Sequence, residues 1–228
     1  MDDPTNDQDK RAAALAAVGE VRSGMIVGLG TGTTAAHAIA ALGQRCRDGL
    51  AIRAVATSDA TARLAIDHGI DIVDFADVAR IDLTIDGADE IDPDLRAIKG
   101  AGGAMLREKI VATASRRMIV IADGSKQVGA LGEARVPVEI LPFGRESVLA
   151  TLGTEAVLRM SGAAPYRTDS GNLIADCRFD LSDPVALARR LDAIPGLLGH
   201  GLFLTEVDAA YIAHRGVVTR LERERTSR

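Results

Sequence analysis

The apolar residues of the chain fall into two alternating patterns. Short strand-type segments rich in Ile, Val, Leu and Ala occur at 25–29, 52–56, 81–85 and 118–122. Helix-type segments alternate with them: one precedes the first strand, at 9–21, and others follow at 35–42, at 59–68 and in the stretch that carries Glu108. Strands that alternate with helices are typical of a parallel sheet covered on both faces. We therefore predict an α/β fold with an open, mostly parallel Rossmann-like sheet and helices on both faces.

The pattern changes after about residue 133. Strand-type and helix-type segments then follow in the order β-α-β-β-α-β, at 136–140, 145–160, 166–168, 173–177, 183–194 and 198–204. This order is that of a split, ferredoxin-like unit, and Pro137 favours an edge position for its first strand. Two last strands, at 209–213 and 217–220, are expected to return to the first sheet. We predict a Rossmann-like catalytic domain from residues 1–131 and 206–228, and a smaller α+β domain from residues 132–205.

Polar clusters follow four of the predicted parallel strands, each at the carboxyl end. They lie at 31–34, 57–58, 86–89 and 123–126. In open parallel sheets the ligand binds at that edge. The sequence therefore places a candidate site there.

The first cluster, after Gly30, has the strand–glycine turn–helix layout of a phosphate site. It lacks the lysine of a P-loop. A dinucleotide fingerprint fits only loosely with Ala35 in third place, and the next strand ends in hydroxyl residues instead of an acid. Hydroxyls at Thr31, Thr33 and Thr34 therefore favour one small phosphate group over a nucleotide.

The stretch 81–115 carries the densest chemistry. Asp86 and Asp89 follow its strand, Lys99 precedes a glycine-rich turn, and Glu108 lies early in the next helix. Each residue alone has a simpler explanation, since aspartates form turns and a glutamate early in a helix interacts favourably with the dipole. Together, acid, base and cation on loops between rigid elements indicate a catalytic site.

Composition narrows the function classes. Aromatic residues make up 3% of the 228-residue chain and Trp is absent, so the core is expected to consist of aliphatic side chains. A net charge of −5 without a basic stripe disfavours nucleic-acid binding. Neither the two cysteines nor the four histidines have metal-ligand spacing, so no metal is expected. The acidic, polar N-terminus and the lack of a long apolar run predict a cytoplasmic protein without a membrane segment.

The chain resembles ribose-5-phosphate isomerase of type A over nearly its whole length. The resemblance rests on the stretches GLGTGTTAAHAI, TSDATARLA, DGADEIDPDLRAIKGAGGAMLREKI, IADGSKQV, PVEILPFG, TDSGNLIAD and PGLLGHGLF. It implies interconversion of ribose 5-phosphate and ribulose 5-phosphate in the pentose phosphate pathway, without a metal or organic cofactor. A homodimer is expected from the family alone.

The resemblance also implies residue roles. Glu108 would be the proton-transferring base, with Asp86, Asp89 and Lys99 around the sugar. The residues expected to bind substrate are Lys10, Thr31, Gly32, Thr33, Thr34, Asp86, Gly87, Ala88, Asp89, Lys99, Gly100, Ala101, Gly102 and Lys126. The chain departs from the family at Thr33, where serine is usual, and at Ala101, which stands in a glycine run. We expect slightly altered phosphate geometry and intact chemistry.

The residues support this chemistry independently. Moving a carbonyl between C1 and C2 requires one carboxylate that takes a proton from one carbon and returns it to the next. The charge that develops on the sugar oxygens needs a fixed cation, a role open to Lys99. Asp86 or Asp89 could open the furanose ring, and the sequence does not assign these two roles separately.

Three other functions are compatible with such a fold. A sugar-phosphate sensor module of a transcription regulator would lack the glutamate at 108 and would carry a helix-turn-helix segment, which the sequence does not show. An aminosugar-phosphate deaminase would need a histidine near the acidic cluster. An acyl-CoA transferase would need its glutamate in a different glycine context. The isomerase is the function that the sequence favours.

Overall fold

The computed structural model describes residues 4–224. Its largest element is a seven-stranded sheet with the order β16-β15-β7-β4-β1-β2-β3. Neighbouring strands are parallel, except for the antiparallel β15–β16 hairpin at one edge. The strands are β1 (Ile26–Leu29), β2 (Arg53–Ala56), β3 (Asp71–Ile72), β4 (Leu83–Gly87), β7 (Met118–Asp123), β15 (Ala209–His214) and β16 (Val217–Glu222). The predicted mostly parallel Rossmann-like sheet is confirmed.

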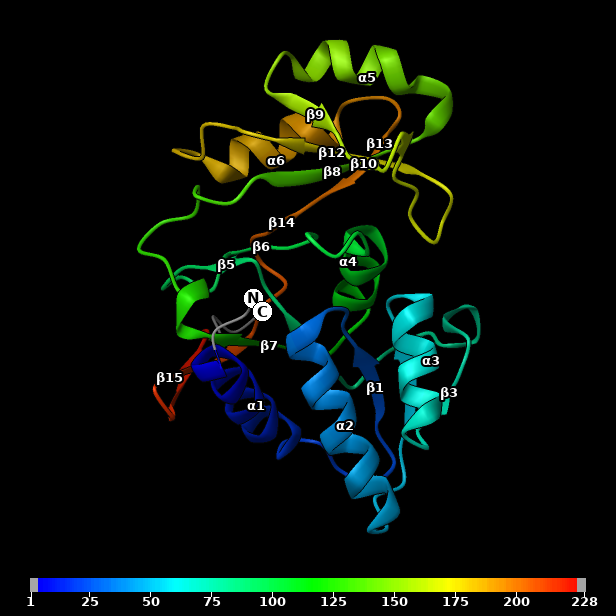
Figure 1. Cartoon of the computed structure of the whole chain (residues 1–228), viewed down its shortest axis with the longest axis vertical. Helices are drawn as coiled ribbons and strands as arrows, with labels where there is room; N and C mark the ends of the chain where they lie inside the picture. The colour runs from blue at the N-terminus through cyan, green and yellow to red at the C-terminus, as the bar shows by residue number, and fades with distance from the viewer. Residues whose placement is uncertain (1–3, 225–228) are drawn as a thin grey trace.

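Helices cover both faces of this sheet (Figure 1). One face carries α1 (Pro4–Val18), α2 (Thr33–Arg47) and α3 (Asp59–Asp67), and the other carries α4 (Met105–Thr113). The central strand β7 shows why both faces need cover. Ile119 and Ile121 pack in the core with α1 and α2, whereas Met118 and Val120 pack with α4. Side chains alternate between the faces of a strand, so a strand that is apolar throughout is buried on both.

Two helix boundaries differ from the prediction. Helix α1 begins at Pro4, earlier than predicted, and ends before Gly19. Helix α2 begins inside the predicted phosphate turn and continues through Gly43 to Arg47. Gly43 lies inside α2, where its missing side chain lets the helix approach His68. An added Cβ at position 43 would lie 2.6 Å from the backbone oxygen of His68.

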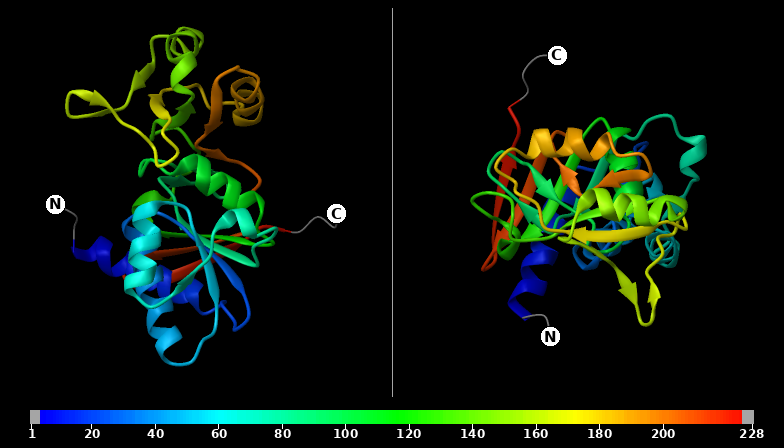
Figure 2. Two further views of the ribbon diagram at one scale, coloured as in Figure 1. Left: turned by 90° about the vertical axis from the view of Figure 1, so that its right-hand side faces the viewer. Right: turned by 90° about the horizontal axis from the view of Figure 1, so that it is seen from above.

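A four-stranded antiparallel sheet forms the upper part of the molecule (Figures 1 and 2). It contains β8 (Val136–Ile140), β9 (Ala156–Leu158), β12 (Leu173–Cys177) and β13 (Leu197–His200), in the order β13-β8-β12-β9. With α5 (Arg145–Leu152) and α6 (Pro184–Asp192) it completes the predicted ferredoxin-like order. A small hairpin, β10 (Met160–Ser161) and β11 (Ala164–Pro165), connects β9 to β12. The exact domain boundaries stay a prediction.

The predicted edge position of β8 is wrong, because β8 pairs with β13 on one side and β12 on the other. Pro137 is tolerated there because its carbonyl accepts from Gly201, just beyond the end of β13. The N and C=O groups of one strand residue point the same way, so the missing N–H also falls outside the regular pairing.

The predicted helix 145–160 is also wrong beyond Leu152. Gly153 ends α5 with a left-handed backbone (φ +87°), and the chain then enters β9. The predicted strand 198–204 is divided at Gly201 into β13 and β14 (Leu202–Phe203).

A third, three-stranded sheet lies between the other two (Figure 1). Its order is β14-β6-β5, with β5 (Glu90–Ile91) and β6 (Ala97–Ile98) next to β14. Lys99 follows β6 directly, and its backbone N–H donates to Gly201 at 2.9 Å. This pairing fixes Lys99 between the two larger sheets. Short 3₁₀ turns η1 (Phe75–Asp77), η2 (Gly124–Lys126) and η3 (Pro142–Gly144) complete the described elements.

Across residues 4–224, no helix combines the length and apolar character needed to cross a bilayer.

Candidate active site

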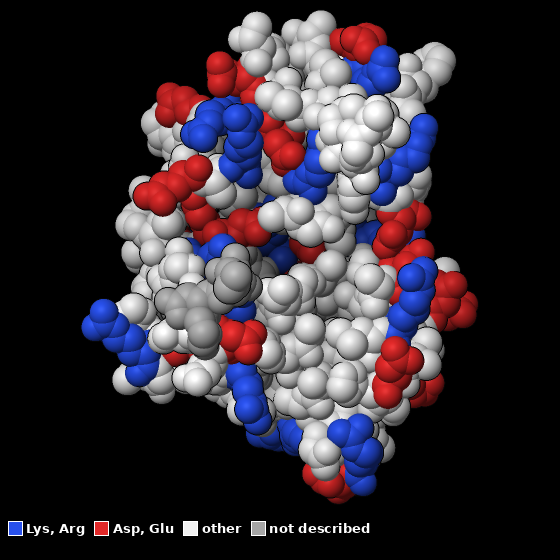
Figure 3. Space-filling view, viewed as in Figure 1, with Lys and Arg blue, Asp and Glu red and all other residues white. Residues whose placement is uncertain are grey.

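The strands β1, β4 and β7 end at one edge of the large sheet, and a pocket of about 310 Å³ lies there. Figure 3 shows the corresponding face hollowed at mid-height, with acidic and basic side chains inside the hollow. The pocket is lined by Lys10, Thr31, Gly32, Thr33, Thr34, Gly87, Ala88, Asp89, Lys99, Gly100, Ala101, Gly102, Glu108 and Lys126. All of the predicted site residues except Asp86 line this pocket. Asp86 is fully buried, with 0% exposure.

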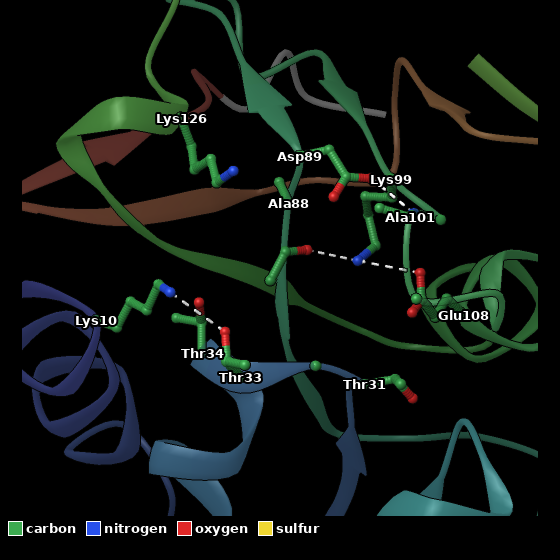
Figure 4. Close-up of a pocket in the computed structure, with 14 residues that line it drawn as sticks. Lys10, Thr31, Thr33, Thr34, Ala88, Asp89, Lys99, Ala101, Glu108 and Lys126 are labelled. Atoms are coloured by element: carbon green, nitrogen blue, oxygen red, sulfur yellow. Dashed lines mark hydrogen bonds and ion pairs between the residues drawn. The ribbon is translucent and has the colours of Figure 1, made fainter. Parts of the chain in front are cut away.

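Lys99 joins the two buried carboxylates. Its Nζ lies 2.9 Å from Oδ2 of Asp86. It also lies 3.2 Å from Oε2 of Glu108 and donates to the carbonyl of Gly87 (Figure 4). Lys99 is 2% exposed and Glu108 is 3% exposed. The acid, the cation and the candidate base thus form one cluster at the inner end of the pocket.

A glycine allows Asp86 to occupy this position. The Asp86 carboxylate accepts from the backbone N–H of Thr31 at 3.2 Å and of Gly87 at 2.7 Å. A Cβ at Gly30 would lie 1.9 Å from Oδ1 of Asp86. The turn after β1 can therefore approach β4 this closely only without a side chain at position 30.

Replacing Gly30 by Ala is expected to displace Asp86 and to destabilise the fold by roughly 1–3 kcal/mol, the usual cost of overpacking. Urea unfolding would measure the loss of stability, and the catalytic rate would measure the displacement of Asp86. Gly129→Ala is the matched control, because an added Cβ there meets nothing within 4 Å. Equal stability and activity of the two variants would contradict the packing argument.

The two carboxylates compete for one lysine. Burial, reinforced by the charge of Asp86, raises the pKa of Glu108 to about 8. Burial also raises the pKa of Asp86, although Lys99 and the N–H groups of Gly87 and Thr31 oppose the rise. Two backbone N–H groups donate to Asp86, whereas no backbone N–H of residues 4–224 donates to Glu108. The ionised form of Asp86 therefore has more hydrogen-bond donors than that of Glu108.

Lys99 remains protonated between these groups. Burial by itself would lower the pKa of its ammonium group, but the charges of Asp86 and Glu108 outweigh burial and raise this pKa overall. The Phe203 ring, with its centroid 5.5 Å from Nζ, covers the lysine. The site thus holds a fixed positive charge beside a carboxyl group that titrates close to neutral pH.

The pKa of Glu108 predicts the pH dependence of catalysis. A base must be ionised, so kcat/KM is expected to rise about tenfold per pH unit below about pH 8 and to level off above it. Initial rates between pH 6 and 10 would measure this rise, which is the acidic limb of the pH profile. A flat profile between pH 6 and 9 would show that no group with such a pKa controls the reaction.

The opposite end of the pocket suits an anion. Lys10 donates to the hydroxyl of Thr33 at 3.3 Å, and Figure 4 shows both residues beside Thr34, with Lys126 across the cavity. Helix α2 begins at Thr33 without a side-chain cap. Because Gly32, Thr33 and Thr34 line the pocket, the first N–H groups and the positive dipole end of α2 lie at its wall.

The side chain of Thr31 differs from the expectation. Figure 4 shows it pointing away from Lys99. Its hydroxyl is bonded to those of Thr57 at 2.8 Å, Ser58 at 2.9 Å and Thr61 at 3.1 Å. The polar end of β2 thus holds the glycine turn in place, and the Thr31 side chain is not directed at a phosphate.

The sequence did not single out Thr61 or Arg159. Thr61 bonds the carbonyl of Gly30 at 3.0 Å, and Arg159 bonds the carbonyls of the glycine-rich turn that follows Lys99. A threonine inside a helix and an isolated arginine in the smaller sheet carry no local motif. Only the tertiary contacts find them.

Known proteins match the chain over most of its length. The family described as ribose 5-phosphate isomerase A (phosphoriboisomerase A) matches residues 53–216. Ribose-5-phosphate isomerase A of Sphingopyxis alaskensis is 50% identical over 214 residues, which cover 92% of this chain and 94% of that protein. The chain belongs to the ribose 5-phosphate isomerase A family.

Solved structures agree with this family. A D-ribose-5-phosphate isomerase in complex with phospho-erythronic acid has a TM-score of 0.92 and 36% identity, over 98% of this chain and 100% of the other. The ribose 5-phosphate isomerase of Plasmodium falciparum has a TM-score of 0.92 and 34% identity, over 96% of this chain and 100% of the other. The family match also disfavours the sensor module and the deaminase.

Proposed function

We propose that this chain interconverts D-ribose 5-phosphate and D-ribulose 5-phosphate through an enediolate. The observation that carries the proposal is the position of Lys99 between two buried carboxylates, at one end of a pocket whose other end is cationic. Pure protein mixed with ribose 5-phosphate should form the ketose, as a colorimetric ketose assay would measure. No ketose formation would refute this function.

Glu108 is the proposed proton carrier. It removes the proton from C2 of the open-chain aldose, the electron pair forms the C1=C2 double bond, and the negative charge moves to O1. A proton then passes from O2 to O1, and Glu108 returns its own proton to C1 while C2=O forms. Lys99 is the buried cation that stabilises the enediolate oxygens, because it is fixed before the charge develops.

Burial separates the proposed roles of the two aspartates. Asp89 lines the pocket and accepts from the backbone N–H of Ala101 at 2.9 Å, so it can reach the sugar and assist ring opening. Asp86 is enclosed below the pocket, where it holds Lys99. We therefore assign ring opening to Asp89 and the orientation of the cation to Asp86.

Activity is expected to survive prolonged dialysis against EDTA. The described residues contain no group of three or more His, Cys, Asp or Glu side chains that could hold a metal ion, and Lys99 supplies the positive charge instead. Rates before and after dialysis would test this expectation. A loss of activity that a divalent ion restores would contradict it.

A cytoplasmic homodimer is the proposed working form. The family resemblance supports the homodimer, and so do the exposed apolar side chains of Phe143 in η3 (97% exposed) and of Leu141 just before it (41% exposed). Analytical ultracentrifugation would measure the oligomeric state. A mass that matches one chain would refute the dimer.

A further inference from the structure

The glycine-rich turn 100–103, which follows Lys99, is contacted by an arginine that directly follows strand β9 of the four-stranded sheet. Arg159 lies between β9 and β10. Its Nη1 donates to the carbonyl of Gly100 at 3.2 Å and to that of Ala101 at 3.0 Å. Both of these turn residues line the pocket. Arg159 therefore contacts the wall of the active site from the side opposite the substrate.

Arg159 is itself held by Asp176, by the backbone of Ile174 and by the ring of Tyr166. Its Nε and Nη2 bind the two carboxylate oxygens of Asp176 in β12, at 2.8 Å and 2.5 Å. Its backbone N–H donates to Ile174 at 2.7 Å, and its guanidinium lies 5.8 Å from the centroid of the Tyr166 ring. The guanidinium thus binds the carboxylate through Nε and Nη2 and the turn through Nη1. The ammonium group of a lysine cannot reproduce this geometry.

The turn needs such support, because glycines make it intrinsically flexible. Gly100 and Gly103 have left-handed backbones, with φ of +109° and +82°. Within the turn, the Gly103 N–H donates to the Gly100 carbonyl at 3.0 Å. The turn also carries the N–H of Ala101, which orients Asp89.

The position of the turn affects both ends of the proton transfer. Lys99 precedes it and is fixed by its pairing with Gly201, whereas Glu108 follows it in the first turns of α4. A displacement of the turn would therefore move Asp89 and the start of α4 relative to a stationary Lys99. Misplacement of catalytic groups by about 1 Å can cost roughly 10²-fold in rate.

We propose that Arg159 is a positioning residue, which holds turn 100–103 so that Asp89 and Glu108 keep their places around the substrate. This inference rests on the proposed isomerase function. It assigns a part in catalysis to the part of the chain that carries the four-stranded sheet, through one side chain that does not line the pocket.

Arg159→Met tests the inference by steady-state kinetics. We expect kcat/KM for ribose 5-phosphate to fall about 10–100-fold, and Arg159→Lys to recover little of this loss. Arg167→Met is the matched control. Arg167 lies between β11 and β12 in the same part of the chain, and it binds the carbonyl of Gly171 instead of turn 100–103. Unchanged kcat/KM in Arg159→Met would overturn the proposal. If that variant does not fold, Asp176→Ala, which removes both carboxylate acceptors of the guanidinium, replaces it with the same two outcomes.

The pH profile separates positioning from general destabilisation. Glu108 is faced by Asp86 from β4, by Asp89 from the loop after β4 and by Lys99 from the end of β6, and Arg159→Met replaces none of these side chains. Loss of a nearby positive charge alone would raise the pKa of Glu108. A loosened turn admits water and lowers this pKa, so we expect the acidic limb of kcat/KM to move to lower pH. A limb that stays in place or moves up would overturn the proposal.

Chemical rescue and amide exchange complete the test. Guanidinium at millimolar concentration should restore part of the activity of Arg159→Ala, and methylammonium should not. Equal rescue by both would contradict the role of the planar guanidinium group.

Hydrogen exchange of the Ala101 amide should be faster in Arg159→Met than in Arg167→Met. Exchange does not depend on activity. An inactive wild-type protein would therefore refute the isomerase function, whereas unchanged exchange would refute the contribution of Arg159.

Discussion

Glu108→Gln is expected to lower kcat by at least about 10²-fold, the low end for removal of a general base. Glutamine keeps the shape of the side chain and its contact with Lys99, but it cannot accept the C2 proton. Glu108 is 3% exposed at the inner end of the pocket and carries a pKa of about 8, so it can both take and return a proton near neutral pH. Asp86, the other carboxylate on Lys99, is enclosed and cannot replace it.

Three measurements isolate this effect. Exchange of the C2 proton with solvent deuterium should fall in parallel with turnover. Binding of an inert sugar-phosphate analogue, measured by calorimetry, should change little, because binding requires no proton transfer. Glu155→Gln, at an exposed position, is the control with the same chemical change and should keep the wild-type rate. Turnover near the wild-type rate in Glu108→Gln would make Asp89 the next candidate for the base.

The same variant has a predicted effect on stability. The pKa of Glu108 in the folded state, about 8, lies above the ordinary value of 4.5. Between these two values the folded state binds the proton and the unfolded state does not, so the contribution of this group to the free energy of unfolding falls as pH rises. Glu108→Gln should therefore be at least as stable as the wild type above pH 8. A loss of activity in that variant would then not reflect unfolding.

Much of the site could be predicted because its residues follow strands directly. Parallel strands point the same way, so the residues after β1, β4 and β7 must meet at one edge of the sheet. Lys99 and Glu108 flank a short glycine-rich turn, which limits how far apart they can lie. These arguments need only local structure and strand direction, and the sequence contains both.

What could not be predicted depends on contacts between distant segments. The Thr31 hydroxyl looked like a phosphate ligand, but the end of β2 and the start of α3 supply three hydroxyls that bind it elsewhere. Pro137 predicted an edge position for β8, but β8 lies inside the sheet. Its missing N–H is tolerated because β13 ends at His200, opposite Val138, before it would pair with Pro137. Arg159 acts through the pairing of β9 with β12, which brings Asp176 beside it. No periodicity or motif records these placements.

The separate roles of Asp86 and Asp89 show the same limit. The two residues are three positions apart and have the same chemistry, so the sequence left their roles open. The structure distinguishes them by burial, which Gly30 permits for Asp86 by leaving room for its carboxylate. The missing side chain at position 30 is therefore one reason why Asp86 lies buried while Asp89 lines the pocket.

Ribose without its phosphate is expected to be a very poor substrate, with kcat/KM lower by roughly 10²-fold or more. A phosphate at the cationic end would accept from the first N–H groups of α2 and from the side chains of Lys10, Thr33 and Thr34, and each hydrogen bond to a charged group contributes about 1.5–3 kcal/mol. Two such bonds already account for the expected factor.

Thr34→Leu tests the same site from the protein side. The larger apolar side chain removes a hydroxyl and fills space beside Lys10, so KM for ribose 5-phosphate should rise strongly (Figure 4). The rate for unphosphorylated ribose should change little, because the proton transfer occurs at the other end of the pocket. Thr151→Val, at an exposed position of α5, is the control and should leave both substrates unaffected. Equal rates for ribose and ribose 5-phosphate with the wild-type protein would show that this end of the pocket does not recognise phosphate.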